Sequence, residues 1–131
     1  MIAVDTSVVV RYLVGTPEAQ AVRAARLIDG HETIALSLVA LVEAAHVLRT
    51  QYGVARADVI DTLLDLVRRE DVVILGMSTS DTTDALVRAR SQPGRPIPEA
   101  LSAIAARASG ALPLHTFDRA MSRYGVAVTE P

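Results

Sequence analysis

Short apolar runs alternate along the chain with longer segments in which apolar residues recur three and four positions apart. Apolar runs bounded by turn residues are typical of buried strands, and the longer spacing is typical of amphipathic helices. We therefore expect strands at 2–4, 33–36, 72–75 and 112–116, with a further edge strand at 126–128. Such alternation predicts an α/β fold, with a central, mostly parallel sheet of four or five strands between layers of helices.

Proline, glycine and small hydroxyl residues mark the ends of the helical segments. Proline favours the first helical position, since no backbone N–H is needed there, and glycine favours helix ends. From these signals and the apolar periodicity we expect helices at 7–14, 17–29, 38–51, 55–69, from the cap candidates at 78–81 to about 90, at 98–110, and in a short segment after 119. The segment 91–96 is predicted to be a loop, too short for a domain linker.

The size and composition are those of one globular domain. The chain has 131 residues, half of them hydrophobic, so we expect a single domain over 1–131 with a full core. It has no cysteine, which excludes disulfides and thiolate metal sites. It has no apolar run near the roughly 20 residues of a membrane span and no signal-peptide pattern. We expect a soluble cytoplasmic protein.

The charge balance gives little direct information about partners. The net charge of −2 disfavours non-specific nucleic-acid binding through bulk charge. All thirteen basic residues are arginine, which matches phosphate geometry better than lysine does, although codon bias in a GC-rich genome explains the same composition. The aromatic content of 3% disfavours a single-strand binder built on stacked bases.

The first seven residues combine a strand, a carboxylate and a helix start. The apolar run 2–4 stops on Asp5, and Ser7 and the apolar run 8–10 follow. In open α/β sheets, ligands bind in the crevice beyond the strand ends, so Asp5 is placed for chemistry. That Asp5 or Ser7 only caps the following helix is an equally good interpretation.

A second acid, Glu43, interrupts a helix whose first turns are apolar nearly all round. We expect those turns to be buried, and a buried carboxylate needs a cation or several donors. Glu43 therefore either pairs with an arginine from another element or helps to hold a metal. The spacing of Glu43 and His46 also occurs in di-iron bundles, but such sites need a second copy of the motif, so His46 is interpreted as a residue at the edge of the core.

Four acids stand apart from the solvated charge: Asp5, Glu43, Glu99 and Asp118. Three follow strands or open helices at junctions that meet at the carboxyl edge of a parallel sheet, so we expect all four to gather in one hollow. Oxygen ligands without cysteine suit Mg²⁺ or Mn²⁺. Four acids suffice for one ion or for two; two ions would serve phosphodiester hydrolysis. The hydroxyls of Ser7 and Thr116 are candidates for supporting contacts.

With these residues in place, the chain resembles the PIN-domain ribonucleases, and among them the VapC-like toxins of bacterial toxin–antitoxin pairs, over essentially its whole length. Residues 2–13 resemble that family's first motif, 37–48 its second, with Glu43 as the acid, and 116–119 its last. The third motif normally reads Asp-Ala-Leu, whereas Glu99 begins it here. The extra methylene predicts weaker metal binding at this position, or a PIN-like RNA- or protein-binding module with weakened or lost catalysis.

The resemblance implies a Mg²⁺-dependent endoribonuclease, for which Mn²⁺ can substitute. Asp5, Glu43, Glu99 and Asp118 would form an acidic pocket in which a metal-activated water attacks a phosphodiester of a structured RNA, tRNA or rRNA. It also implies a homodimer, and a heterotetramer or larger assembly with a small VapB-like antitoxin that places a basic side chain in the pocket. Flanking arginines would line the path of the RNA; the candidates nearest the site in sequence are Arg11, Arg95, Arg119 and Arg123.

Overall fold

The structure is a computed structural model that describes residues 1–30 and 33–131. Its elements are, in order, β1 (Ile2–Val4), α1 (Thr6–Val14), α2 (Glu18–Asp29), β2 (Ile34–Ser37), α3 (Leu38–Thr50), α4 (Arg56–Val67), β3 (Val72–Leu75), α5 (Thr79–Arg90), α6 (Ile97–Ala108), β4 (Leu114–His115), a 3₁₀ helix η1 (Arg119–Tyr124) and β5 (Val128–Thr129). The predicted α/β class is confirmed, and the observed bounds lie close to those expected.

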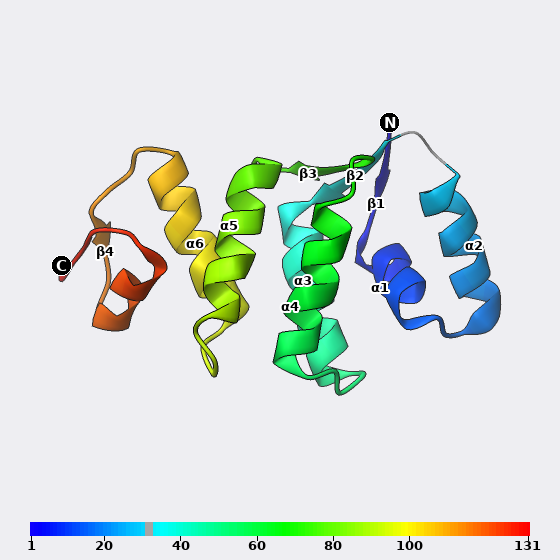
Figure 1. Ribbon diagram of the computed structural model, residues 1–131, viewed down its shortest axis with the longest axis horizontal. Coiled ribbons are helices and arrows are strands. Elements are labelled where there is room, and N and C mark those ends of the chain that lie inside the picture. The colour runs from blue at the N-terminus through cyan, green and yellow to red at the C-terminus, as the bar shows by residue number, and fades with distance from the viewer. Residues whose placement is uncertain (31–32) are drawn as a thin grey trace.

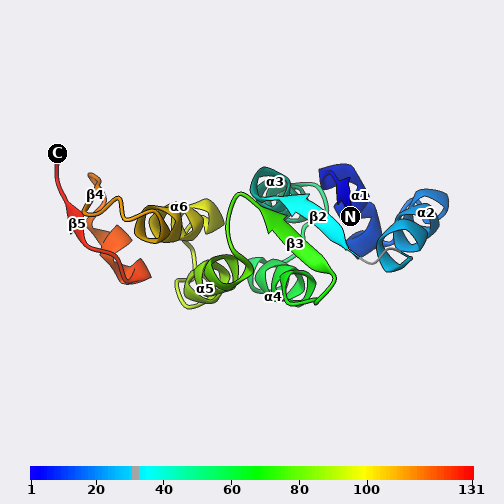
Figure 2. The same ribbon diagram turned by 90° about the horizontal axis from the view of Figure 1, so that it is seen from above.

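All the strand pairs of the described residues are parallel, but they form two sheets rather than one. The larger sheet has the order β1-β2-β3, and β4 pairs with β5 in a separate two-stranded sheet. The central strand β2 is buried at Ile34, Ala35 and Leu36, as a strand covered on both faces should be. Figure 2 shows α3 on one side of this sheet and α4 on the other, which gives the expected three layers.

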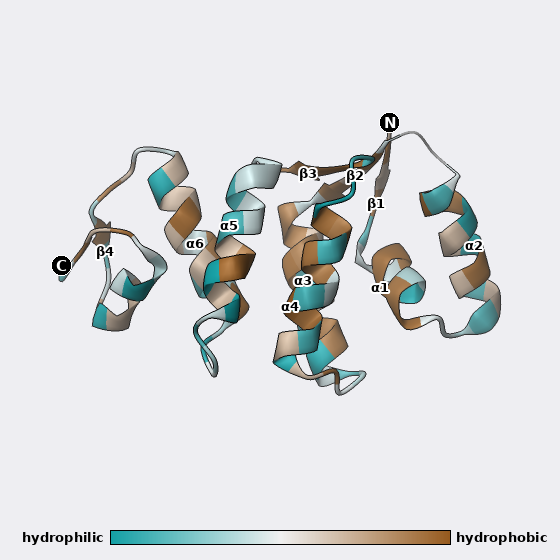
Figure 3. Cartoon of the chain, in the orientation of Figure 1, coloured by the Kyte–Doolittle hydropathy of each residue, from teal (hydrophilic) through white to brown (hydrophobic). Residues whose placement is uncertain are grey.

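Hydrophobic residues are concentrated in the three-stranded sheet and in the neighbouring helices α3 and α4 (Figure 3). The core continues from there into α5 and α6, where Leu86 and Ile104 are fully buried, and reaches Tyr124 of η1. No helix among the described residues combines the length and the apolar character needed to cross a membrane.

The molecule is elongated, and its two sheets lie far apart. In Figure 1 the β4 region occupies one end, followed by α6, α5 and the α3/α4 pair, with β1, α1 and α2 at the other end. The turn that leads from β3 into α5 passes through Gly76, whose φ of 104° is a conformation that other residues rarely adopt. This arrangement sets the strand ends that carry Asp5 and Asp118 at opposite sides of the helical layer.

Candidate functional site: two carboxylate pairs

Asp5 lies at the end of β1 and caps the N-terminus of α1. Its Oδ1 accepts hydrogen bonds from the backbone N–H of Ser7 and of Val8, at 3.0 and 3.3 Å, and from the Ser7 hydroxyl at 2.6 Å. The Ser7 hydroxyl is the main cause that lowers the pKa of the Asp5 carboxyl from its ordinary value. The capping interpretation of this stretch is therefore confirmed. The Asp5 carboxylate is also exposed, and its role in chemistry stays a prediction.

Glu43 lies close to this turn, on the exposed face of α3. The hydroxyl of Thr6, the first residue of α1, donates a hydrogen bond to Glu43 Oε2 at 2.8 Å. One open pocket is lined by both carboxylates; its residues are Asp5, Thr6, Ser7, Val10, Arg11, Glu43 and Val47. Among the residues that the structure describes, neither carboxylate forms an ion pair.

The expectation that the first turns of α3 are buried nearly all round is therefore wrong. Glu43, His46 and Val39 are exposed, with Val39 at 76%. These positions share one face of the helix, and that face borders an open groove instead of the sheet. Its remaining faces are buried at Ala40, Leu41 and Ala44. Glu43 is consequently available to a ligand without the desolvation cost that burial would impose.

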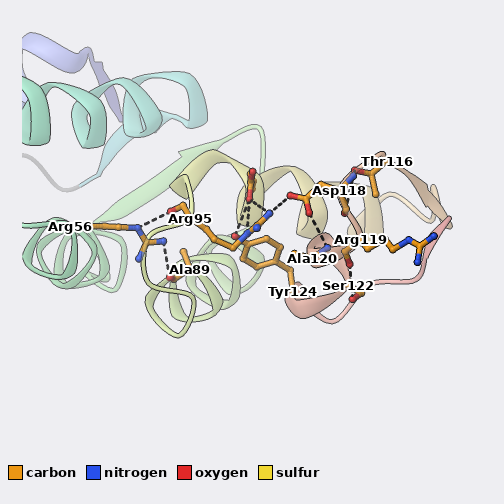
Figure 4. A network of polar contacts seen from close by, with 10 residues as sticks. Arg56, Ala89, Arg95, Thr116, Asp118, Arg119, Ala120, Ser122 and Tyr124 are labelled. Atoms are coloured by element: carbon orange, nitrogen blue, oxygen red, sulfur yellow. Dashed lines mark hydrogen bonds and ion pairs between the residues drawn. The ribbon is translucent and has the colours of Figure 1, made fainter. Parts of the chain in front are cut away.

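A second carboxylate pair, Glu99 and Asp118, lies around Arg95; Figure 4 shows Arg95 beside Asp118 and Tyr124. Arg95 Nε donates a hydrogen bond to Glu99 Oε2 at 3.0 Å. Arg95 Nη2 forms ion pairs with Glu99 Oε2, at 2.8 Å, and with Asp118 Oδ2, to which it also donates a hydrogen bond. The Tyr124 hydroxyl donates to Glu99 Oε2 at 3.3 Å. Arg95 is the main cause that lowers the pKa of Asp118, and burial raises the pKa of Tyr124.

The loop around Asp118 resembles the turn around Asp5 in its local hydrogen bonding. Asp118 Oδ1 accepts from the backbone N–H of Ala120 at 2.9 Å, which caps η1. The Thr116 hydroxyl accepts from the Asp118 N–H at 3.0 Å, so Thr116 supports the turn, as Ser7 supports Asp5. Each strand-end aspartate thus begins a helix and is held by a neighbouring hydroxyl residue.

The four acids do not gather in one hollow of the single chain, contrary to expectation. No group of three or more histidines, aspartates or glutamates suited to hold a metal occurs within residues 1–30 and 33–131. The cause is the strand pairing, because β4 pairs with β5 and not with β1, and β4 lies at the far end of the molecule (Figure 1). The assignment of Asp5, Glu43, Glu99 and Asp118 as metal ligands stays a prediction.

Comparison with protein families gives a single assignment that spans almost the whole chain. The family model described as PIN domain matches residues 2–127. The chain belongs to the PIN-domain family. PIN domains are in general nucleases and typically use divalent metals. No curated protein and no solved structure matches the chain at a significant level.

The donors that this PIN domain offers fit a hard divalent cation. The pocket at the end of β1 supplies carboxylate and hydroxyl oxygens from Asp5, Glu43, Thr6 and Ser7, with no sulfur or imidazole. Mg²⁺ usually keeps several waters and takes only one or two protein carboxylates together with substrate phosphates. Asp5 and Glu43, neither of which forms an ion pair among the described residues, are therefore enough protein carboxylates for a hydrated Mg²⁺ in this open pocket.

The four arginines that sequence proximity suggested have different surroundings. Arg11 lines the Asp5–Glu43 pocket, and its guanidinium donates to Gln20 at 2.7 Å and to Tyr52 at 3.4 Å. Arg95 is engaged with the second acid pair. Arg119 is 86% exposed and reaches Glu130 only at 3.8 Å. Arg123 is exposed, and its charge helps to lower the pKa of Asp118. Arg11 is thus the arginine best placed beside the first carboxylate pair.

A groove of about 740 Å³ runs between α3 and α6 of the PIN domain. It is lined mostly by apolar side chains, among them Val39 and Leu101, and it includes Glu43 and His46. His46 therefore lines a groove instead of lying at the edge of the core. Glu43 lines both this apolar groove and the pocket at the end of β1, so the two are adjacent.

Sequence reasoning missed Thr6 and Tyr124 as partners of the acids. Thr6 follows Asp5 directly, and a helix-opening threonine beside a strand-end acid is a usable signal, but its contact with Glu43, 37 residues away, is not local. Tyr124 gave no signal, because its contact with Glu99 depends on how η1 packs against α6. Arg95 was suggested as an RNA contact, whereas the structure places it between two carboxylates.

Proposed function

We propose that this PIN domain is a Mg²⁺-dependent endoribonuclease and the toxin of a toxin–antitoxin pair. The observation that carries the proposal is the open pocket at the end of β1, where Asp5 and Glu43 are held by neighbouring hydroxyls and have no ion pair among the described residues. A carboxylate pair of this kind favours a cation over a neutral ligand. The family supports nuclease chemistry for that cation.

The residues of the pocket have separate tasks in this proposal. Asp5 and Glu43 would hold the ion. Glu99 and Asp118 lie apart from this pocket in the single chain, so they would complete the surroundings of the ion only where the two carboxylate pairs are brought together. Ser7 keeps Asp5 ionised by lowering its pKa, and Thr6 fixes the orientation of Glu43. Arg11 lies beside the pocket, where a guanidinium would bind the phosphate on either side of the scissile bond. A bound divalent ion supplies the Lewis acid that activates water and stabilises the leaving oxygen.

The substrate that we propose is a structured RNA, tRNA or rRNA, cut at few sites to leave a 5′-phosphate and a 3′-hydroxyl. The net charge of −2 argues against retention of RNA by bulk charge, so the recognition would depend on the shape of the RNA and on local arginines. The antitoxin would be a small VapB-like protein. The apolar groove between α3 and α6, which includes Glu43, supports a partner that inserts an apolar segment and brings a cation to that acid.

The test is cleavage of total tRNA and rRNA by the purified protein, with mapping of the RNA ends, for the parent and for Asp5→Asn and Glu43→Gln. We expect Mg²⁺-dependent cuts with 5′-phosphate ends and loss of cleavage in both variants, with circular dichroism spectra unchanged. The exposed Asp65, on the outer face of α4, supplies the matched control Asp65→Asn, which should cut like the parent. Equal cleavage by parent, Asp5→Asn and Glu43→Gln would refute the proposal.

A second candidate is a PIN-like module that binds RNA or protein with weakened catalysis. The engagement of Glu99 with both Arg95 and Tyr124 favours it, since these donors stabilise the carboxylate without a metal. Glu99→Asp decides between the two candidates, because the shorter side chain withdraws from Tyr124 and restores the usual motif of the family. A rise in Mg²⁺-dependent cleavage identifies a working site that glutamate weakens, and continued inactivity with retained RNA binding identifies the module.

A further inference from the structure

Both sheets of the described residues end in edge strands, and two of these, β1 and β4, each present an edge that has no partner strand. Within residues 1–30 and 33–131, β1 pairs only with β2, and β4 pairs only with β5. Free edges readily pair with another chain, and an isolated two-stranded sheet has little stability of its own. Here the smaller sheet pairs only two residues from each strand. Both edges belong to parallel sheets, so β4 can extend the larger sheet next to β1 in the same orientation.

The side chains near these two edges are complementary in charge. Asp5 follows β1 and shares a pocket with Glu43 without an ion pair among the described residues, whereas Asp118 follows β4 and brings Arg95 with it. Neighbouring strands lie about 4.8 Å apart, so pairing of β4 with β1 would set Asp118 beside Asp5 and bring Arg95 toward the uncompensated carboxylates. Phe117, 84% exposed in the single chain, would enter the same contact.

The chain's own packing holds β4 away from its own β1. Helices α4, α5 and α6 pack side by side between the two strands (Figure 1), and Ala85, Ala89 and Ala103 in that packing have no exposed surface. The Arg56 guanidinium fixes the connection between α5 and α6 to α4, with hydrogen bonds to the carbonyls of Ala89 and Arg95 at 2.9 and 2.8 Å (Figure 4). In the single chain, this packing keeps three helices between β4 and β1.

We propose that β4 of each copy pairs with β1 of a second copy, so that two chains build two composite sites. In Figure 1, β4 lies at one end of the elongated molecule and β1 lies in the other half, next to α1 and α2. Two antiparallel copies therefore satisfy both edges through a two-fold axis and leave a closed dimer. Each five-stranded sheet then has the order β3-β2-β1 from one copy and β4-β5 from the other. The inference rests on the proposed function in one respect: Asp5 and Glu43 of one copy would share a metal with Asp118 and Glu99 of the other.

Subunit complementation tests the composite site. Asp5→Asn and Asp118→Asn chains are co-expressed with different tags and assayed as a mixture. In a mixed dimer one site carries both substitutions and the other carries neither. About half of the dimers are mixed and each of these has one intact site out of two, so the mixture should recover about a quarter of the parent activity. The matched control is a mixture of Asp5→Asn chains and Glu43→Gln chains. Asp5 and Glu43 of one site come from the same copy, so each site of this mixed dimer carries one substitution, and the mixture should stay inactive. An active parent without recovery in the first mixture overturns the proposal.

A second readout does not depend on activity. The chain has no cysteine, so Ala3→Cys on the exposed side of β1 is mixed with His115→Cys or Leu114→Cys on β4, and the mixtures are oxidised. We expect a disulfide between differently tagged chains in one of the two mixtures, since adjacent strands meet the Cα spacing of a disulfide, and none with the control Ser80→Cys. A monomer by light scattering, or no interchain disulfide, overturns the proposal. Interchain disulfides in the cysteine variants, together with a parent chain that cleaves no RNA, uphold the strand pairing and refute the nuclease function.

Discussion

At the residue scale, one hydroxyl connects the turn that carries Asp5 to the helix that carries Glu43. Thr6 is half-buried at the start of α1, and its Oγ donates to Glu43 Oε2 at 2.8 Å. Ser7, one position on, donates to Asp5. Two adjacent residues thus orient two acids from different elements, which is the kind of support that fixes ligand geometry around a metal.

Removing the Thr6 hydroxyl should reduce activity while the fold is kept. Thr6→Val has a similar shape but donates no hydrogen bond, so Glu43 becomes free to rotate away from the pocket. We expect Mg²⁺-dependent cleavage, or the apparent affinity for Mg²⁺, to fall by about 10- to 100-fold, the usual effect of losing a supporting contact of a metal ligand. Thr6→Ser keeps the hydroxyl and should cut like the parent. Equal rates for the valine and serine variants would assign Thr6 a purely structural role.

Arg95 controls the ionisation of Asp118. Because the folded pKa of Asp118 lies below its ordinary value of about 3.9, the ion pair stabilises the fold fully above that value, and the stabilisation is lost as the pH falls through the lowered pKa. In Arg95→Gln the Asp118 pKa should rise toward the ordinary value, as measured by NMR titration of the side-chain carboxyl carbon. The Asp5 pKa, which depends on Ser7 instead, serves as the internal control. An unchanged Asp118 pKa would show that Arg95 is not its partner in solution.

At the element scale, local signals were sufficient to place the helices and strands. The run 2–4 predicted β1 and placed Asp5 at its end. The helix expected at 38–51 begins where expected, and the Ser37 hydroxyl caps it by accepting from the Ala40 N–H at 3.0 Å. The burial of α3 was misjudged, because a nearly uniform apolar sequence does not reveal which face meets the sheet and which borders a groove. Glu43 marked the open face, and the exposed Val39 shares it.

The contact that fixes α5 and α6 to α4 contributes measurably to stability. Arg56→Met keeps the length of the apolar stem but leaves the carbonyls of Ala89 and Arg95 without that donor. We expect the free energy of unfolding to fall by about 1.5–3 kcal/mol, the usual contribution of hydrogen bonds that involve a charged group, as measured by urea denaturation. Arg26→Met, on the exposed face of α2, is the matched control and should change it little. Equal stability of the two variants would contradict this role of Arg56.

At the scale of the whole molecule, the sequence predicted the layers, the parallel strands and the family, but not the division into two sheets. β4 has only two paired residues, too few to specify a register or a partner strand from sequence, and strand pairing over such distances along the chain has no local signature. The expectation of a single acidic hollow depended on that pairing. The structure therefore confirms that Asp5 and Asp118 follow strands, but it places those two strands in separate sheets.

The proposed function of the whole molecule depends on the binding of a divalent ion by the carboxylate pair at the end of β1. Anomalous diffraction at the manganese absorption edge measures this binding most directly. Crystals of the full chain grown with Mn²⁺ should show an anomalous peak bounded by the carboxylates of Asp5 and Glu43, with the Asp118 carboxylate beside it, and crystals of Asp5→Asn should lack that peak. Crystals that show no peak at Asp5 and Glu43 at saturating Mn²⁺, and in which each of these carboxylates is paired with an arginine, would contradict the proposed metal site.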